Sequence, residues 1–304
     1  MRKPGNVIFL FVDGLGLGGP DPVTNPCLGK DIRLLSFHED GQSVRRIGHD
    51  GFLAATDALL GVEGLPQSAT GQTTLFTGMN CARLIRSHLK GFPNEALRQV
   101  LREKSVLKRL KEAGRRPAFV NAYRPLFFRL SEKMKWRLSA TTATNLAADL
   151  PFCTYDDLLD GIALYHDFTN SFLIAKGFEA PKRTPEEAGR ILAGLSKEYD
   201  FILYEYFLTD RAGHTKDMAK AYPILLQYDR FLRTVLDNVD PEETLVLLTS
   251  DHGNIEDLSV ETHTANRVPT LLWGRKAEEL SRNIRSLADV TPAVLEAFDI
   301  LEPA

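Results

Sequence analysis

An apolar run that ends abruptly in a carboxylate, close to the start of the chain, constrains the fold more than any other feature of the sequence. Residues 7–12 (VIFLFV) are all apolar, and Asp13 and Gly14 follow directly. Such an unbroken run is typical of a strand buried on both faces of a parallel sheet. Three later segments have the same character and a fourth is weaker: residues 118–120, 201–204 and 245–248, and residues 269–273. We therefore expect a sheet of buried strands.

Helical patterns separate these strands. Residues 95–113 carry leucine and valine close to a 3.6-residue period, and residues 216–239 and 289–298 are further helical stretches. Thr184, followed by proline and two glutamates, is a typical helix start. Strands that alternate with helices predict an α/β fold, in which helices flank a mostly parallel central sheet.

The middle of the chain departs from this alternation. Residues 124–182 contain scattered aromatic residues and a Ser/Thr-rich stretch, without a clear order of strand and helix. We interpret them as an inserted, lid-like or cap-like region. The core is then formed by residues 1–123 together with residues 183–304.

Charge and cysteine content exclude several classes of partner. The 304 residues include 37 Lys and Arg against 40 Asp and Glu, and no basic block occurs. This argues against nucleic acid or an anionic membrane as the main partner, because both select concentrated positive charge. The three cysteines are odd in number and widely spaced, which favours a reducing compartment.

The targeting signals that the sequence could carry are also constrained. The first apolar run is too short for a secretory signal, and no stretch approaches the roughly 18 apolar residues of a membrane span. We therefore expect a cytoplasmic protein with no membrane partner. The sequence does not indicate the oligomeric state.

Acidic and histidine residues concentrate next to the predicted strands. The candidates are Asp13, Asp210, His214, Asp251, His252 and His263. Taken singly, each has an ordinary structural explanation as a turn-forming residue, a helix cap or a surface side chain. Together, three aspartates and three histidines suit a site for two divalent cations, with Zn²⁺ or Mn²⁺ as the candidates. Two such ions can clamp the attacking and leaving oxygens in phosphoryl transfer.

That chemistry requires a nucleophile, and residues 65–74 supply candidates. This polar stretch of small residues could open a helix whose N-terminal amides attract an anion. A hydroxyl at such a place can attack phosphorus. Four hydroxyls are present, and their spacing alone does not choose between them: Ser68, Thr70, Thr73 and Thr74.

Five short motifs, in order along the chain, resemble the alkaline phosphatase superfamily. They are Asp13-Gly14, Ser68 three residues before Gly71, Asp210 to His214 (DRAGH), Asp251 to Asn254 (DHGN), and His263-Thr264 ahead of Val268-Pro269. The nearest likeness is to the branch that holds cofactor-independent phosphoglycerate mutase and phosphopentomutase. It covers roughly residues 5–95 and 195–300.

The resemblance implies a role for each of these residues. Ser68 would be the nucleophile that becomes transiently phosphorylated. Asp210, His214 and His263 would hold one metal ion. The other would be held by Asp13, Ser68, Asp251 and His252.

These features predict a two-metal-dependent phosphoryl-transfer enzyme of the phosphatase or phosphodiesterase type, acting on a small phosphorylated metabolite. The alternatives are a phosphosugar or phosphoglycerate mutase and a metal-binding member of the superfamily without catalysis. One departure bears on this choice, because both mutases carry histidine at the position of Gln72.

Several polar residues are candidates for substrate binding. They are Gln72, Asn80, Arg83 and His88, and the last three are equally consistent with a solvated helix end. His166 and Asp167, in the predicted insertion, are expected either to face the site or to lie on the surface. Arg267 could touch the substrate or merely precede a strand.

Overall fold

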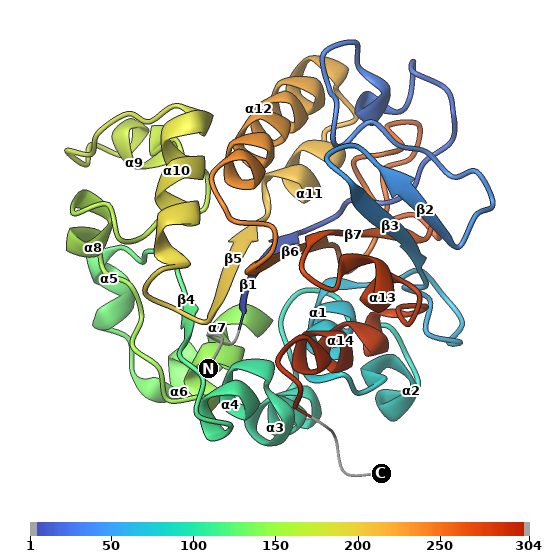
Figure 1. Cartoon of the computed structure of the whole chain (residues 1–304). Helices are drawn as coiled ribbons and strands as arrows, with labels where there is room; N and C mark the ends of the chain where they lie inside the picture. Colours follow the sequence, from blue (N-terminus) through green and yellow to red (C-terminus); the bar gives the residue numbers. More distant parts are fainter. Residues whose placement is uncertain (1–4, 301–304) are drawn as a thin grey trace.

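Seven strands form one sheet in the order β2-β3-β7-β6-β1-β5-β4 in the computed structural model, which describes residues 5–300 (Figure 1). The strands are β1 (Asn6–Val12), β2 (Val44–Ile47), β3 (Gly51–Thr56), β4 (Pro117–Phe119), β5 (Phe201–Tyr206), β6 (Thr244–Thr249) and β7 (Val268–Gly274). All five strands expected from the sequence are therefore present. The hairpin of β2 and β3 is additional.

The sheet is mixed rather than mostly parallel. Strands β4, β5, β1 and β6 are parallel to one another, as expected for buried apolar runs. Strand β7 pairs antiparallel with β6, β3 with β7, and β2 with β3. The α/β prediction is confirmed. The expectation of a mostly parallel sheet is corrected, because β2, β3 and β7 form an antiparallel side. Strand β2 is only partly buried, so its sequence lacks the apolar run that marks the other strands.

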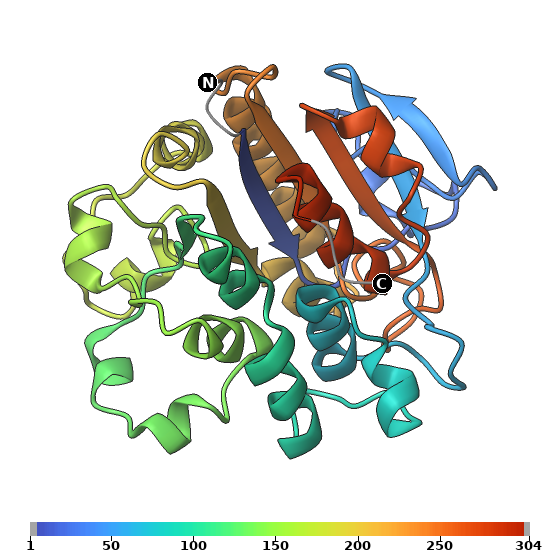
Figure 2. The same ribbon diagram turned by 60° about the horizontal axis from the view of Figure 1, so that its bottom comes forward.

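Helices cover both faces of the sheet (Figures 1 and 2). One face packs against α1 (Ser68–Thr77), α3 (Glu95–Lys104), α4 (Val106–Glu112), α7 (Ala140–Ala147), α13 (Ala277–Ser281) and α14 (Val290–Ala297). The opposite face packs against α10 (Pro185–Leu195), α11 (Leu208–Gly213) and α12 (Met218–Asp237). Alternation along β1 explains the two cores, because Val7, Phe9 and Phe11 point to one face and the residues between them to the other. Within residues 5–300, each helix is too short or too polar to cross a bilayer.

The expected helices are found with one interruption. The capping box at Thr184 opens α10, and the predicted helices near residues 216–239 and 289–298 are α12 and α14. The single helix expected over residues 95–113 is divided into α3 and α4 at Ser105. The Ser105 hydroxyl accepts a hydrogen bond from the Lys108 amide and donates one to the Thr144 carbonyl at 2.9 Å. These contacts fix a new helix start there.

The middle region contains five short helices that do not form one layer. They are α5 (Pro125–Phe128), α6 (Glu132–Lys135), α7, α8 (Tyr155–Leu159) and α9 (Ser171–Ala175). Helix α7 packs against α1, α3 and α4 and buries Ala140 and Ala143 in the core. In Figure 1, α5, α8 and α9 lie beyond the β4 edge of the sheet. A lid would thus comprise only part of the region, and its division at residues 124 and 182 stays a prediction.

The remaining short elements lie at the borders of this core. They are the 3₁₀ helices η1 (Pro26–Leu28) and η2 (Leu287–Asp289), and α2 (Cys81–Ile85). Helix α12 holds the loop that follows η1 through Asp229, which is completely buried. Its Oδ1 accepts hydrogen bonds from the amides of Arg33, Leu34 and Leu35 at 3.2, 2.7 and 2.9 Å.

We expect Asp229→Ala to lower the free energy of unfolding by about 3 kcal/mol, because it leaves buried amides without an acceptor. Asp237→Ala on the same helix is the matched control. Its carboxylate is exposed and lies 3.8 Å from His49, so its loss should change stability by less than about 0.5 kcal/mol. Urea denaturation of both variants measures the difference. An equal effect of the two changes would contradict the role assigned to Asp229.

Candidate metal centre and nucleophile

The candidate ligands converge because several strands end at one edge of the sheet. Asp13 and Asp251 follow the parallel strands β1 and β6, and Asp210 lies in α11, directly after β5. His263 precedes its strand instead of following it. Strand β7 runs antiparallel to β6, so its start lies beside the end of β6. His263 therefore reaches the same edge as the aspartates.

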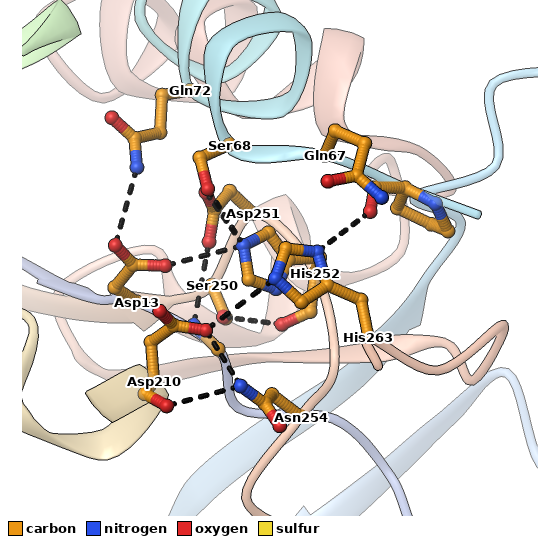
Figure 3. Close-up of polar contacts among 12 residues, drawn as sticks. Asp13, Gln67, Ser68, Gln72, Asp210, Ser250, Asp251, His252, Asn254 and His263 are labelled. Carbon is orange, nitrogen blue, oxygen red and sulfur yellow. Dashed lines mark hydrogen bonds and ion pairs between the residues drawn. The ribbon is translucent and has the colours of Figure 1, made fainter. Parts of the chain in front are cut away.

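Asp210, His214 and His263 form the first group of potential metal ligands. The Oδ1 atom of Asp210 lies 3.4 Å from His214 Nε2 and 3.6 Å from His263 Nε2. Asn254 donates a hydrogen bond from Nδ2 to the same Oδ1 at 2.7 Å and another to the Asp210 carbonyl at 3.0 Å. These hydrogen bonds from the Asn254 amide hold the Asp210 carboxylate in place (Figure 3).

Asp13, Asp251 and His252 form the second group. The Nε2 atom of His252 lies 3.3 Å from Asp13 Oδ1 and 3.5 Å from Asp251 Oδ2. The two groups adjoin, since the rings of His252 and His263 stack with their centroids 3.6 Å apart. The two groups contain the six residues that the sequence singled out, divided as the resemblance implied.

All three histidines are oriented in the same way by the backbone. The Nδ1 atoms of His214, His252 and His263 face the carbonyl oxygens of Glu261, Gly253 and Pro66, at 3.2, 3.4 and 2.9 Å. A hydrogen on Nδ1 satisfies each of these contacts and leaves the lone pair on Nε2. Contacts of this kind hold metal-binding histidines in other proteins. Each Nε2 here is directed at a carboxylate.

The donor atoms fit divalent cations. Ligands about 2.0–2.1 Å from a tetrahedral Zn²⁺ lie about 3.3–3.4 Å from one another, close to the separations within both groups. Two buried carboxylate oxygens of the second group, Asp13 Oδ1 and Asp251 Oδ2, accept no hydrogen bond from residues 5–300. Buried carboxylate oxygens are rarely left without a partner, and a cation would satisfy both.

The electrostatics of the second group favour a bound cation. Burial, reinforced by the charge of Asp13, raises the pKa of Asp251 well above its usual range. Burial alone would lower the pKa of His252, but Asp251 and Asp13 outweigh it and raise that pKa to about 10. The carboxylates therefore concentrate negative charge beside the buried Asp251 and His252 side chains. A divalent cation compensates such charge.

Ser68 is the hydroxyl that faces these groups (Figure 3). It is the first residue of α1, and its Oγ lies 3.1 Å from His252 Nε2. The hydroxyls of Thr70 and Thr73 instead donate to the carbonyls of Gln67 and Ala69 within the same helix, and Thr74 accepts from the Cys81 amide. Among the four candidate hydroxyls, the direction of the side chains therefore favours Ser68.

Close packing of α1 holds Ser68 at this place. A Cβ atom added to Gly71 would lie 2.7 Å from the Asp251 carbonyl oxygen, so only glycine permits the approach. Gln72, one residue further on, is buried and donates from Nε2 to Asp13 Oδ2 at 3.4 Å. Gln72 is thus the one predicted substrate-binding residue whose side chain contacts a candidate metal ligand.

The other predicted substrate-binding residues have local contacts. Asn80 caps α2 by accepting from the Arg83 amide, and its Nδ2 donates to the Leu60 carbonyl. Arg83 is exposed, and His88 Nε2 lies 3.3 Å from the Val62 carbonyl. The structure does not place these three side chains along the pocket beside Ser68, so their role in substrate binding stays a prediction.

Most of the residues around that pocket were not predicted from the sequence. It is lined by Asp13, Ser68, Gln72 and Asp210, and also by Asn121, Arg124, Glu205 and Arg211. Burial, with a contribution from Asp13, raises the pKa of Glu205 to about 8. Glu205 lies within the otherwise apolar strand β5. A single carboxylate among buried residues was the only sequence feature that could have identified it as a pocket residue.

The structure shows the positions of His166, Asp167 and Arg267, for which the sequence left two alternatives open. His166 lines the pocket, with its ring stacked on Phe207 at 4.5 Å between centroids. Asp167 is buried and accepts from the Phe172 amide at 2.9 Å. Arg267 forms an ion pair with Glu39, so it has a structural partner.

Part of the chain is similar in sequence to known metalloenzymes. Residues 171–301 match the model of the Metalloenzyme superfamily. The 2,3-bisphosphoglycerate-independent phosphoglycerate mutase of Moorella thermoacetica is 32% identical over 125 residues, which cover 39% of this chain and 24% of the mutase. The same enzyme of Thiobacillus denitrificans is 33% identical over 126 residues, with the same coverage. The chain thus spans about a quarter of the length of these relatives.

Similarity to solved structures extends over the whole chain. The PH0037 protein from Pyrococcus horikoshii superposes with a TM-score of 0.59 at 15% identity, covering 100% of this chain and 99% of that one. Alkaline phosphatase from the Antarctic bacterium TAB5 gives a TM-score of 0.51 at 14% identity, covering 99% and 100%. At these identities the similarity establishes a shared fold.

Proposed function

We propose that this chain, a member of the metalloenzyme (alkaline phosphatase) superfamily, is a two-metal phosphohydrolase that uses Ser68 as its nucleophile. The contact that carries the proposal is Ser68 Oγ at 3.1 Å from His252 Nε2, between two groups of potential metal ligands. In this arrangement Asp210, His214 and His263 would hold one ion. Asp13, Asp251, His252 and Ser68 would hold the other, and Zn²⁺ or Mn²⁺ would suit such mixed ligands.

The cations, when bound, supply charge that stabilises the attacking and leaving oxygens. The protein itself positions the nucleophile and the anion. Ser68 begins a buried ten-residue helix, and the amides of that first turn and the helix dipole favour an anionic phosphoryl group there. Gln72 holds Asp13 by its amide and closes the site from the side of α1.

The proposed hydrolysis of the phosphate ester has two steps. In the first, a bond forms between Ser68 Oγ and phosphorus while the bond from phosphorus to the leaving oxygen breaks. The hydroxyl proton passes to solvent and the leaving oxygen takes one up, so that an alcohol departs. In the second, water attacks phosphoserine, which restores the Ser68 hydroxyl and releases inorganic phosphate.

We favour hydrolysis over a mutase reaction because water has access to Ser68. The side chain is only half-buried, and two side chains of the same pocket, Phe92 and Leu126, are 61% and 66% exposed. A mutase must retain its substrate while the phosphoryl group is repositioned. Phosphate release and phosphoryl retention are directly distinguishable in an assay.

Metal analysis together with phenyl phosphate hydrolysis tests the proposal. We expect about two Zn²⁺ or Mn²⁺ ions per chain after reconstitution, and phosphate release that is lost on chelation and recovered with added metal. Failure to bind metal would contradict the assignment of both ligand groups. Two bound ions without turnover of any phosphate ester would instead favour a non-catalytic metal-binding protein.

A further inference from the structure

The pocket beside Ser68 is much larger than the transferred group requires. Its volume is about 610 Å³, and Asp13, Ser68 and Asp210 are among its lining residues. Pockets of roughly 300–1,000 Å³ are the size that holds an organic ligand of moderate size. A phosphoryl group next to Ser68 therefore leaves most of this space for the leaving group.

The rest of the pocket is mainly apolar. Its walls come from the end of β5, from the segment around α5 and α6, and from the loop after α2. The side chains that matter here are Phe92, Tyr123, Leu126, Phe127, Leu138 and Phe207. Exposed apolar side chains gathered at one opening are unusual in a protein surface and mark a place where a ligand or partner binds.

Four polar side chains of the lining, those of Asn121, Tyr123, Ser139 and Thr142, are engaged in hydrogen bonds within the protein. Asn121 donates to the Glu205 carbonyl and accepts from the Glu205 amide, both at 2.8 Å. The Tyr123 hydroxyl lies 2.7 Å from Thr142 Oγ1, which lies 2.9 Å from the Ser139 hydroxyl. Groups engaged in this way are not poised to receive the hydroxyls of a sugar or of glycerol.

Positive charge lies beside this apolar space. Arg124 and Arg211 line the pocket, and neither forms an ion pair with a carboxylate within residues 5–300. The Arg211 guanidinium instead lies over the Phe172 ring, 5.3 Å from its centroid. Burial, with Arg211 and Arg124, lowers the pKa of His166 to about 3, so this ring joins the aromatic wall as an uncharged group.

We propose that the substrate is a phosphate ester of a large apolar alcohol, aryl or long-chain alkyl, whose apolar part occupies this pocket. The inference rests on the proposed function for the position of the phosphoryl group. It narrows the small phosphorylated metabolite expected from the sequence to an amphiphilic phosphate ester. The two arginines attract its charge, and the walls from Tyr123 to Phe207 bury its apolar part.

Binding of alkylphosphonates tests this inference without requiring turnover, because their carbon–phosphorus bond is not hydrolysed. Calorimetry on the metal-reconstituted protein would compare ethyl-, butyl-, hexyl- and octylphosphonate. We expect Kd to fall about fourfold for each methylene that is buried, until the chain fills the pocket. Octyltrimethylammonium, which has the same chain and the opposite charge, should bind at least tenfold more weakly than octylphosphonate.

A double variant locates the binding. Phe92→Ser with Leu126→Ser alters two exposed side chains of the pocket, and should reduce the preference for octyl over ethyl by roughly tenfold. The matched control, Leu84→Ser with Leu159→Ser, alters exposed side chains outside the lining and should keep that preference. A Kd that is independent of chain length, or a preference that the double variant retains, would overturn the inference. Absence of phosphate release from esters would count against the proposed function alone.

Discussion

Ser68→Ala should reduce phosphate release from phenyl phosphate by roughly a thousandfold or more, because it removes the nucleophile and leaves no hydroxyl in its place. The other six potential ligands are unchanged, so metal content and the unfolding transition should remain near those of the unaltered protein. Steady-state kinetics, metal analysis and circular dichroism measure the three properties. The expected pattern is loss of turnover alone.

The matched control is Ser87→Ala, an exposed serine on the loop after α2. It should hydrolyse phenyl phosphate at the original rate. Mass spectrometry of the acid-quenched unaltered enzyme should find one added phosphoryl group on the peptide that contains Ser68, and none in the alanine variant. Turnover in Ser68→Ala within a few-fold of the original rate would contradict a covalent mechanism at this residue.

Much of the fold was predictable because buried strands leave a strong signal. Residues 7–12, 201–204 and 245–248, which lie within β1, β5 and β6, form unbroken apolar runs, as expected of strands buried on both faces. Helix α10 was equally clear, since Thr184 and Glu187 complete a capping box. Local chemistry fixes such elements with little help from the rest of the chain.

Strand direction was not predictable in the same way, and it determines the site. His263 precedes its strand, so a parallel β7 would have placed it at the opposite edge of the sheet from Asp13 and Asp251. Antiparallel pairing with β6 brings it back to them. The apolar pattern of residues 269–273 does not indicate the direction of β7. That direction follows from the connection between β6 and β7 and from the pairing of β7 with β3.

The candidate ligands were more predictable than the pocket around them. Asp, His and glycine at particular spacings have few other combined uses, so six candidate ligands could be named from the sequence, and the resemblance to a known family indicated Ser68 as the candidate nucleophile. Arg124 and His166 carry no such pattern, and only the packing of the middle region against the end of β5 brings them to the pocket beside Ser68. Candidate metal ligands can thus be predicted from sequence motifs, whereas the residues that determine substrate specificity depend on tertiary contacts.

Asp210→Asn should remove one of two metal ions and with it nearly all turnover. The Oδ1 atom of Asp210 is shared by His214 and His263, so its charge is central to the first group. A neutral amide keeps the shape of the side chain but is a poor ligand for a divalent cation, and affinity at this group should fall by roughly a hundredfold or more. Metal analysis after dialysis should find about one ion per chain instead of about two.

The second group should still bind its metal ion after this change, because Asp13, Asp251 and His252 do not depend on the Asp210 carboxylate for a hydrogen bond. Its retention would show that the two groups bind metal separately, although His252 and His263 stack. Asp160→Asn, at an exposed position beyond α8, is the control and should keep both ions and full turnover. If Asp210→Asn retained both ions, Asp210 would not be a ligand. If Asp210→Asn lost both ions, the two groups would form one cooperative centre coupled through the stacked imidazoles. The change of one carboxylate in the first group would then also empty the second group.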